Sequence, residues 1–461
     1  MKKIIVAVVA FGFGIANAQE VENDSIKPIS TISLDSLQQS INEHQLKFDA
    51  LNEQLSPMQE QVDRMSKIKI SGYMQVQFEM YNYQDVPVVI PAAGTSPAKT
   101  VFYQLKPNSS ETNYTILNTN TVDVNNSFNI RRARIKFTYQ PIEGVIFVLQ
   151  PNFSFSAVTL KDAYVQLNDT WINTFQLWVG QFNRPDYEVE FSSRDRIIME
   201  RTRMSSILYP QERDLGAKIS MNLATQYEIP LKIDIAAFNG NFGEGPIGNQ
   251  VTDVDSEKDF VVRTTYSLQF PKQGLGIDFG ASGYYGKNTV FSAGTYSDVD
   301  NKPFTAAVGD KLKKQWFGAE VQIFSDLLGG IALKTEFNKG VISGTSGVAI
   351  LNNNPSFNFS GERDFTGYYV TLEKNFGTKF QGGVRYDSFD PNNRLSGDEV
   401  TLSQDLKVHT WGFAFHYFFT TNTKIGLGYT MPINETSTTV SGIYNDDVKN
   451  NIATLRFQAS F

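Results

Sequence analysis

The spacing of apolar residues divides the chain into two parts with different periods. From residue 34 to residue 65, seam positions that are all apolar except His44 recur at strictly alternating intervals of three and four. A narrow stripe of this kind over five heptads predicts a coiled-coil helix over residues 32–66, with a helix packed on its own domain as the alternative. The helix is expected to kink at Pro57. The seam consists of Leu34, Leu37, Ile41, His44, Phe48, Leu51, Leu55, Met58, Val62 and Met65.

From Lys67 to the C-terminus the period is two, which is typical of strands. In residues 67–79, apolar side chains such as Ile68 and Ile70 alternate with polar ones, and residues 453–461 behave alike. Fourteen further segments alternate in the same way, at 127–140, 143–156, 158–167, 173–183, 213–223, 228–239, 259–270, 274–287, 311–325, 328–340, 363–375, 378–389, 404–419 and 422–433. An all-β membrane protein is therefore predicted: residues 67–461 form a sixteen-stranded antiparallel transmembrane β-barrel, of a size that encloses water.

The connections between these segments alternate in length. Short turns such as QPIEG, NDTWIN and ATQY alternate with long stretches such as 81–126 and 184–212. The connection near Ser156 is the exception, because it is short where a long loop is due. Short turns on one side and long loops on the other mark a bacterial outer-membrane barrel, whereas a soluble sandwich or propeller explains only the alternation. This orientation places the coiled-coil helix in the periplasm.

The N-terminus agrees with export. A charged start, an apolar run from Ile4 to Ile15 and an Ala-Asn-Ala site predict a secretory signal over residues 1–18, followed by a polar linker over 19–31. Removing the two signal lysines from 41 basic residues leaves 39 against 48 acidic ones, a mature net charge of −9. No later stretch approaches the ~20 apolar residues of a membrane helix. Cysteine is absent, so burial and backbone pairing must hold the fold.

The stretch over residues 184–212 is unusually rich in arginine and carboxylates and contains no lysine. Arginine pairs bidentately with carboxylates, so such a loop is expected to hold a definite shape. We interpret it as a loop that folds inward and constricts the pore. The residues assigned to this constriction are Arg184, Glu188, Glu190, Arg194, Arg196, Arg201, Arg203 and Arg213.

If the apolar side of each strand faces lipid, the other side must face water. The basic residues that this rule assigns to the lumen wall are Arg132, Arg134, Lys136, Lys218, Arg263, Lys334, Arg385 and Arg456. Only four acidic residues join them, Asp278, Glu320, Glu336 and Asp387, although the whole chain is acidic. A basic wall that faces a mixed loop is expected to prefer small anions.

Three of these cations lie two residues apart on one strand and so point the same way. Arg132, Arg134 and Lys136 can form a column along which an anion passes. Alternatively, they pair with carboxylates such as Glu188 and Glu190 and hold the loop in place.

Several segments resemble the phosphate-selective porin O and P family. They include FNIRRARIKF (128–137), FVLQPNFSFS (147–156), VGQFNRPDYEVE (179–190) and SSRDRIIMERT (192–202). The resemblance implies a trimeric sixteen-stranded outer-membrane barrel with a constricting third outer loop, which passes phosphate or other small solutes. Next to that family pattern, the heptad helix looks like an added periplasmic stalk.

Three functions stay open. The first is passive diffusion of small hydrophilic solutes with a lean towards anions, and the second is a structural or adhesive barrel with a plugged lumen. The third is sugar uptake, which would need an aromatic slide from Tyr73, Tyr164, Tyr284 and Trp316. No G-x-S-x-G elbow is present, so we expect no enzyme activity. We also expect no cofactor, metal or nucleic-acid partner; the expected partners are the outer-membrane bilayer, two further copies in a homotrimer and the solutes.

Overall fold

The computed structural model describes residues 65–82, 84–90, 99–107, 114–118, 126–154, 158–187, 192–209, 212–240, 253, 255–344, 360–440, 444–448 and 450–461. The signal, the linker and all but the last two residues of the predicted coiled-coil helix lie outside these ranges, so that helix stays a prediction. Among the described residues, no helix has the length and apolar character needed to cross a bilayer.

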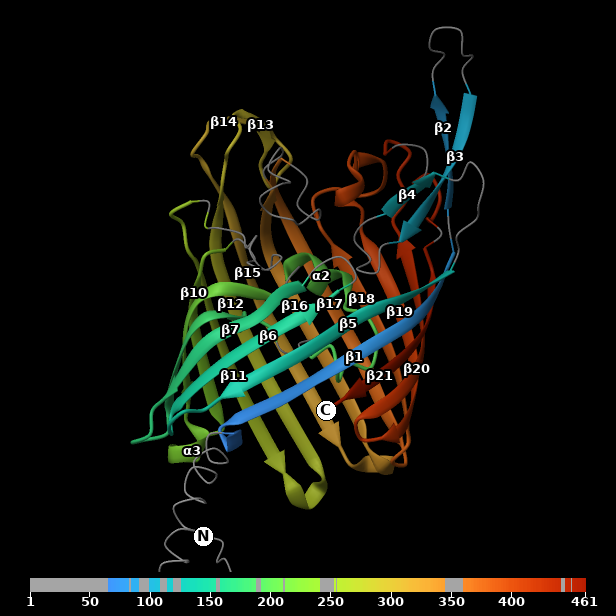
Figure 1. The fold of residues 1–461 in the computed structure, drawn as a ribbon. Coiled ribbons are helices and arrows are strands. Elements are labelled where there is room, and N and C mark those ends of the chain that lie inside the picture. The colour runs from blue at the N-terminus through green and yellow to red at the C-terminus, as the bar shows by residue number, and fades with distance from the viewer. Residues whose placement is uncertain are drawn as a thin grey trace, which may run out of the picture. The chain divides into compact units, whose positions relative to one another are not determined.

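Sixteen antiparallel strands close into a barrel (Figure 1). They are β1 (Ile68–Tyr81), β5 (Asn126–Tyr139), β6 (Val145–Phe153), β7 (Val158–Asn168), β8 (Phe175–Asn183), β9 (Arg213–Asn222), β10 (Leu231–Phe238), β11 (Asp259–Phe270), β12 (Leu275–Thr289), β15 (Lys311–Ser325), β16 (Ile331–Gly344), β17 (Gly361–Phe376), β18 (Phe380–Asp390), β19 (Val408–Thr420), β20 (Thr423–Asn434) and β21 (Ile452–Ser460). The barrel predicted from the alternating pattern is confirmed.

Closure comes from β1, which pairs with β5 on one side and with β21 on the other. The Gly72 N–H donates to the Phe461 carbonyl at 3.0 Å, so the pairing continues to the last residue. An open edge in lipid would leave backbone groups without partners, which explains why the first and last strands must meet.

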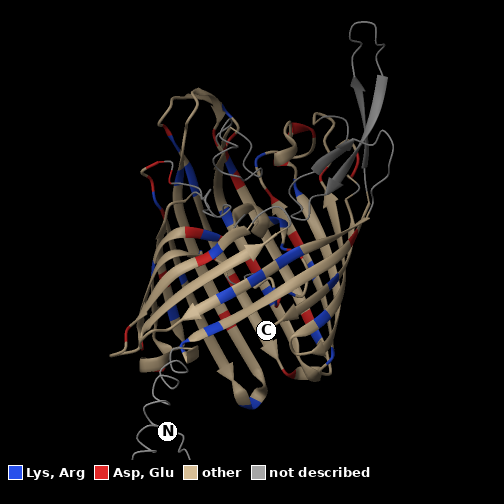
Figure 2. Cartoon of the chain, in the orientation of Figure 1, with Lys and Arg blue, Asp and Glu red and all other residues tan. Residues whose placement is uncertain are grey.

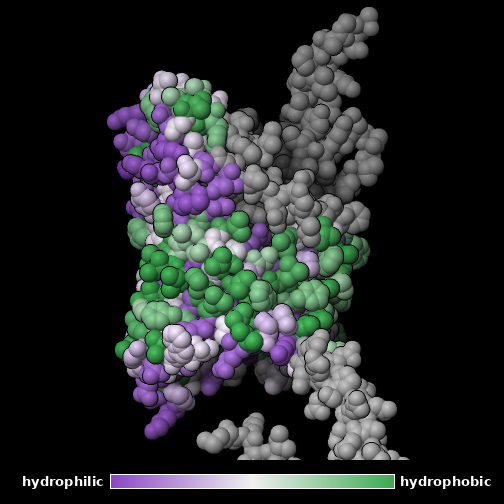
Figure 3. Space-filling model, turned by 60° about the vertical axis from the view of Figure 1, so that its left-hand side comes forward, coloured by the Kyte–Doolittle hydropathy of each residue, from purple (hydrophilic) through white to green (hydrophobic). Residues whose placement is uncertain are grey.

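The two faces of the wall differ as the alternation predicts. On β19, Trp411, Phe413 and Phe415 are exposed on the outside, whereas Thr410 and His416 are buried on the inside. Figure 3 shows a hydrophobic band on the face of the barrel that it displays, with hydrophilic residues above and below it. Aromatic and β-branched residues suit both the strand backbone and a lipid-facing surface.

Short turns lie at one end of the barrel and long loops at the other, as expected (Figure 1). The short turns contain α3 (Ala224–Tyr227), η1 (Pro271–Gln273) and η2 (Leu327–Gly329). The long loops contain elements that alternation did not reveal: the sheet of β2 (Gln84–Ile90), β3 (Lys99–Pro107) and β4 (Tyr114–Asn118), the hairpin of β13 (Gly294–Ser297) and β14 (Pro303–Ala306), and η4 (Gly397–Glu399) and η5 (Ser403–Asp405). The long connection predicted at 81–126 therefore contains three strands of its own.

Candidate functional site

The loop between β8 and β9, residues 184–212, turns into the barrel. Its ends are tied together because the Arg184 N–H donates to the Glu212 carbonyl at 3.1 Å. The buried Arg184 guanidinium binds both Asp186 oxygens, at 2.6 and 3.2 Å. It also lies 4.5 Å from the ring centroid of Tyr284 on β12, which favours the cation. The entry to the loop is thus held by an internal ion pair, as the sequence suggested.

The C-terminal part of the loop is packed against the inner wall. This part contains a six-residue helix, α2 (Arg203–Leu208). Thr202 caps its N-terminus, because the Thr202 side chain accepts a hydrogen bond from the Ser205 N–H at 3.1 Å. Tyr209, after the helix, stacks on Tyr187 with ring centroids 4.2 Å apart. The buried loop residues Met204, Ile207 and Leu208 share one hydrophobic cluster with the wall residues Tyr284, Trp316, Phe365, Tyr369 and Phe389. Burying these apolar groups stabilises the inward position.

The middle of the loop lies on a patch of wall glycines. We call Gly383, Gly412, Gly426 and Gly428, on β18 to β20, the glycine seat. A Cβ atom at Gly383 would be 2.5 Å from Ile197 Cγ1, and one at Gly412 would be 3.0 Å from Ile198 Cγ2. His416 fixes the same segment, because its Nε2 lies 2.7 Å from the Ile197 carbonyl. Only the absence of side chains lets the loop approach this closely.

Glu200 is the main charged anchor of the loop. Its carboxylate is bound by Arg131 at 3.0 and 2.9 Å, by Arg456 at 2.5 Å and by Arg132 at 3.5 Å. Arg385 donates to the Glu200 carbonyl at 2.8 Å. Burial by itself raises the pKa of the Glu200 carboxyl, but the arginines hold that pKa well below its usual range. Glu200 therefore stays ionised, and the contact is lost only at strongly acid pH.

Arg131 was missed by the alternation argument, which placed it on the lipid side. The pairing of β1 with β5 shifts between Gln75 and Val76, so that Gln75 faces Arg132 and Val76 faces Ile130. Arg131 is the extra residue of this bulge, and it reaches Glu200 together with Arg132. A bulge re-aims one side chain without changing the sequence pattern around it.

A second set of contacts holds the start of the inward segment against β1 and β5. The Ser193 carbonyl accepts from Gln75 at 2.8 Å, and the Ser193 hydroxyl lies 2.7 Å from the Tyr73 hydroxyl. Arg134 donates to the same hydroxyl at 3.3 Å and to Asn152 at 3.1 Å. Two members of the predicted cation column, Arg132 and Arg134, therefore contact the loop.

The other residues assigned to the constriction differ in their ion-pair partners and in their burial. Arg201 pairs with Glu212, and Arg194 pairs with Asp195 at the exposed tip, at 2.9 Å. Arg213 is the first residue of β9 and lies outside the loop itself; it pairs with Glu212 and, at 2.9 Å, with Asp162. Arg196 and Arg203 are half-buried. Glu188 and Glu190 lie outside the described residues.

Four of the eight predicted wall cations are paired with wall carboxylates. Lys218 lies 3.7 Å from Asp234, Lys334 binds Glu373 at 2.7 Å, Arg385 binds Asp387 at 3.2 Å, and Arg263 binds Glu320. Figure 2 shows basic and acidic residues together on the strands of the wall. Such pairs contribute little net charge to the lumen.

A positive excess is concentrated in one part of the wall. We call Arg131, Arg132, Arg134, Lys136, Lys424 and Arg456, on β5, β20 and β21, the basic sector. Its main acidic partner is Glu200 of the loop, with Glu79 of β1 close to Arg131. Within the described part of the chain, Lys136 and Lys424 form no ion pair.

The four aromatic residues considered for a sugar slide do not form an open row. The Tyr73 hydroxyl is bound to Ser193. Tyr284 and Trp316 stack on each other at 3.9 Å and are buried next to the loop, and Tyr164 stacks on Trp178 at 4.7 Å. These four residues therefore present no run of open ring faces.

Comparison with known proteins adds the family. Residues 103–302 match the model of the family described as phosphate-selective porin O and P. The family resemblance is confirmed. No curated protein sequence matches this chain significantly. Together with the closed barrel, the match supports an outer-membrane channel of the porin type, a class that is typically not enzymatic.

Three solved structures illustrate the likeness of the fold. OprB from Pseudomonas putida is 11% identical, with a TM-score of 0.52 over 87% of this chain and 96% of that chain. The outer-membrane channel DcaP of Acinetobacter baumannii is 12% identical, with a TM-score of 0.49 over 86% and 97%. An anion-selective porin from Comamonas acidovorans is 10% identical, with a TM-score of 0.48 over 86% and 99%. At these identities the likeness concerns the fold alone.

Proposed function

We propose that this porin is a passive diffusion channel for small hydrophilic solutes, with a preference for anions such as phosphate. The observation that carries the proposal is the basic sector, where six cations face the lumen and the nearby carboxylates are Glu200 and Asp195 of the loop and Glu79 of β1. In a narrow passage with low-dielectric walls, such an imbalance attracts anions and repels cations. The loop 184–212 narrows the passage and brings solutes close to this sector.

Charge reversal at Lys136 is expected to shift the reversal potential towards cations while the conductance stays near that of the wild type. Lys136 lies on the same strand and the same face as Arg134, but it forms no ion pair within the described residues. Lys136→Glu therefore changes the field without removing a loop contact that the structure records. Planar-bilayer recordings in a salt gradient measure the shift.

Arg134→Glu is the matched variant, because Arg134 also holds Ser193. We expect it to shift selectivity and also to raise the conductance as the loop loosens. A wild-type channel that prefers cations at moderate salt would refute the anion lean whatever the variants do.

We further propose that the channel is a trimer, with the heptad helices forming a parallel periplasmic coiled coil. The unbroken three-four spacing from Leu34 to Met65 supports this assembly. Replacing Ile41 and Leu51 by aspartate would bury three charges in each layer and is expected to separate the helices. Cross-linking across the stalk and the particle mass in detergent test it. A wild-type particle with the mass of a monomer contradicts the proposal.

A closed barrel that serves adhesion is the second candidate function. It is favoured by the dense packing of the loop on the wall, which buries Met204, Leu208 and Tyr209 completely. Conductance separates the two, because a plugged barrel passes no steady current and a porin does.

A further inference from the structure

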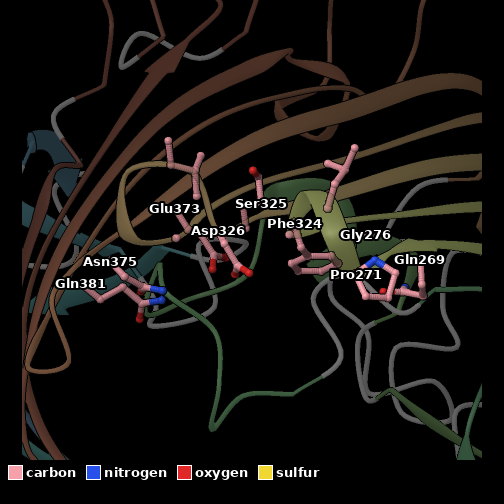
Figure 4. A pocket seen from close by; sticks show the side chains of 14 residues that line it. Gln269, Pro271, Gly276, Phe324, Ser325, Asp326, Glu373, Asn375 and Gln381 are labelled. Carbon is pink, nitrogen blue, oxygen red and sulfur yellow. The ribbon is translucent and has the colours of Figure 1, made fainter.

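A cavity of about 630 Å³ lies in the lumen at the end of the barrel that carries the short turns (Figure 4). It is formed by β11, β12 and β15 to β18, on a part of the wall that does not include the basic sector. Its polar lining comes from Gln269, Ser325, Asp326, Glu373, Asn375 and Gln381. The size falls within the usual range for small-molecule sites, roughly 300–1,000 Å³.

The amides of this cavity are available to a solute. The side chains of Gln269, Asn375 and Gln381 make no hydrogen bond within the described part of the chain, and neither does the Asp326 carboxylate. Each amide offers one acceptor oxygen and two N–H donors, so each can serve two neighbouring hydroxyl groups. The cavity thus presents both donors and acceptors on one wall.

Glycines keep these polar groups against the wall and leave the space in front of them open. A Cβ atom at Gly276 would be 3.0 Å from the Gln269 oxygen, and one at Gly330 would be 2.8 Å from the Asn375 nitrogen. Gly330 also has φ +108°, which side-chain-bearing residues rarely adopt. A side chain at either glycine would therefore displace the amide beside it.

The cavity also has an apolar face and little net charge. Phe324 of β15 lines it and is 38% exposed. Glu373 is neutralised by Lys334 at 2.7 Å, so Asp326 is the lining charge that has no ion pair among the described residues. The lining residues include no lysine or arginine, and Asp326 repels an anion. A neutral solute that carries hydroxyl groups on its edge and C–H groups on its faces satisfies both the amides and the ring.

We infer that this cavity is a binding subsite for neutral sugars at the periplasmic mouth of the channel. The subsite adds a second class of solute, and its proposal does not depend on the anion preference that we propose for the basic sector. Gln381 and Asn375 hydrogen-bond the hydroxyl groups, while Phe324 packs against the C–H face of the ring.

The test is the reduction of ion current by maltose, added to each side of a planar bilayer in turn. We expect a saturable reduction that is stronger from the side of the short turns. In the double variant Asn375→Ala/Gln381→Ala, and separately in Phe324→Ala, the half-effective maltose concentration should rise about tenfold, as the loss of two modest hydrogen bonds or of one ring contact implies.

Gln166→Ala is the matched control, since Gln166 is an amide of β7 near the same end of the barrel but on another part of the wall. It should leave the maltose effect unchanged, and all variants should keep the wild-type current without sugar. The inference is overturned if maltose acts no differently from equally viscous polyethylene glycol too large to enter, or if Gln166→Ala weakens the effect as much as the lining variants do. Reversal potentials from the same bilayers report separately on the anion proposal.

Discussion

Replacing Glu200 by alanine is expected to release the loop 184–212 from the basic sector and to raise the single-channel conductance. In the wild type, Arg131, Arg132 and Arg456 converge on this carboxylate, and Arg385 binds its carbonyl. Removing one partner of a buried ion pair typically costs roughly 3–5 kcal/mol. Here the cost falls on the docked loop, because the arginines that remain also repel one another. Conductance of single channels in planar bilayers measures the result.

Two controls show whether loop movement is the cause. Glu200→Gln keeps the shape of the side chain and removes its charge, so the conductance should lie between those of the wild type and Glu200→Ala. The chain has no native cysteine, so Ile198→Cys with Gly412→Cys can form a single disulfide that ties the loop to β19. Added to Glu200→Ala, this bond should restore a conductance near that of the wild type, and its reduction should abolish the effect. A folded Glu200→Ala channel with unchanged conductance contradicts the anchoring role.

The barrel was predictable because each strand has one lipid face and one water face. That constraint requires apolar and polar residues to alternate along each strand. The alternation is present in segments as different as β1 and β19. It also fixes the side to which a residue points, which is why His409 and His416 lie on opposite faces of β19. The lengths of the connections then indicated which end of the barrel carries the short turns and which carries the long loops.

The contacts inside the barrel were not predictable in the same way. A bulge determines on which face of β5 the Arg131 side chain lies, and the alternation of apolar and polar residues does not reveal this bulge. Glu200 is one of six acidic residues in the stretch 184–212, and only the path of the loop brings it to three arginines. The glycine seat was invisible because a glycine in a strand pattern does not reveal what approaches it. These features arise from pairs of residues that are far apart in the chain.

The loop has two anchors on neighbouring parts of the wall. Glu200 and Ser193 hold it to β1, β5 and β21, whereas Ile197 and Ile198 lie on the glycine-seat residues of β18 and β19. Weakening the first anchor is expected to release the loop from the wall at the basic sector. Filling the seat should change the conductance in the opposite direction, because it pushes the loop away from β18 and further into the lumen.

Gly383→Val is therefore expected to lower the conductance, opposite in sign to Glu200→Ala. The new side chain starts from a Cβ atom 2.5 Å from Ile197 Cγ1, so Ile197 has to move away from β18. Overpacking of this kind typically costs roughly 1–3 kcal/mol. Valine itself suits a strand, which leaves the wall intact.

Gly283→Val on β12 is the matched control for this prediction, because a Cβ atom there meets no atom within 4 Å. It should conduct like the wild type. The seat proposal fails if Gly383→Val inserts normally and conducts as well as Gly283→Val. It is strengthened if Ile197→Ala, which removes the clashing methyl groups, restores the current of the Gly383→Val channel. That rescue would tie the current to one contact between the loop and the wall, since neither substitution changes a charge in the pore.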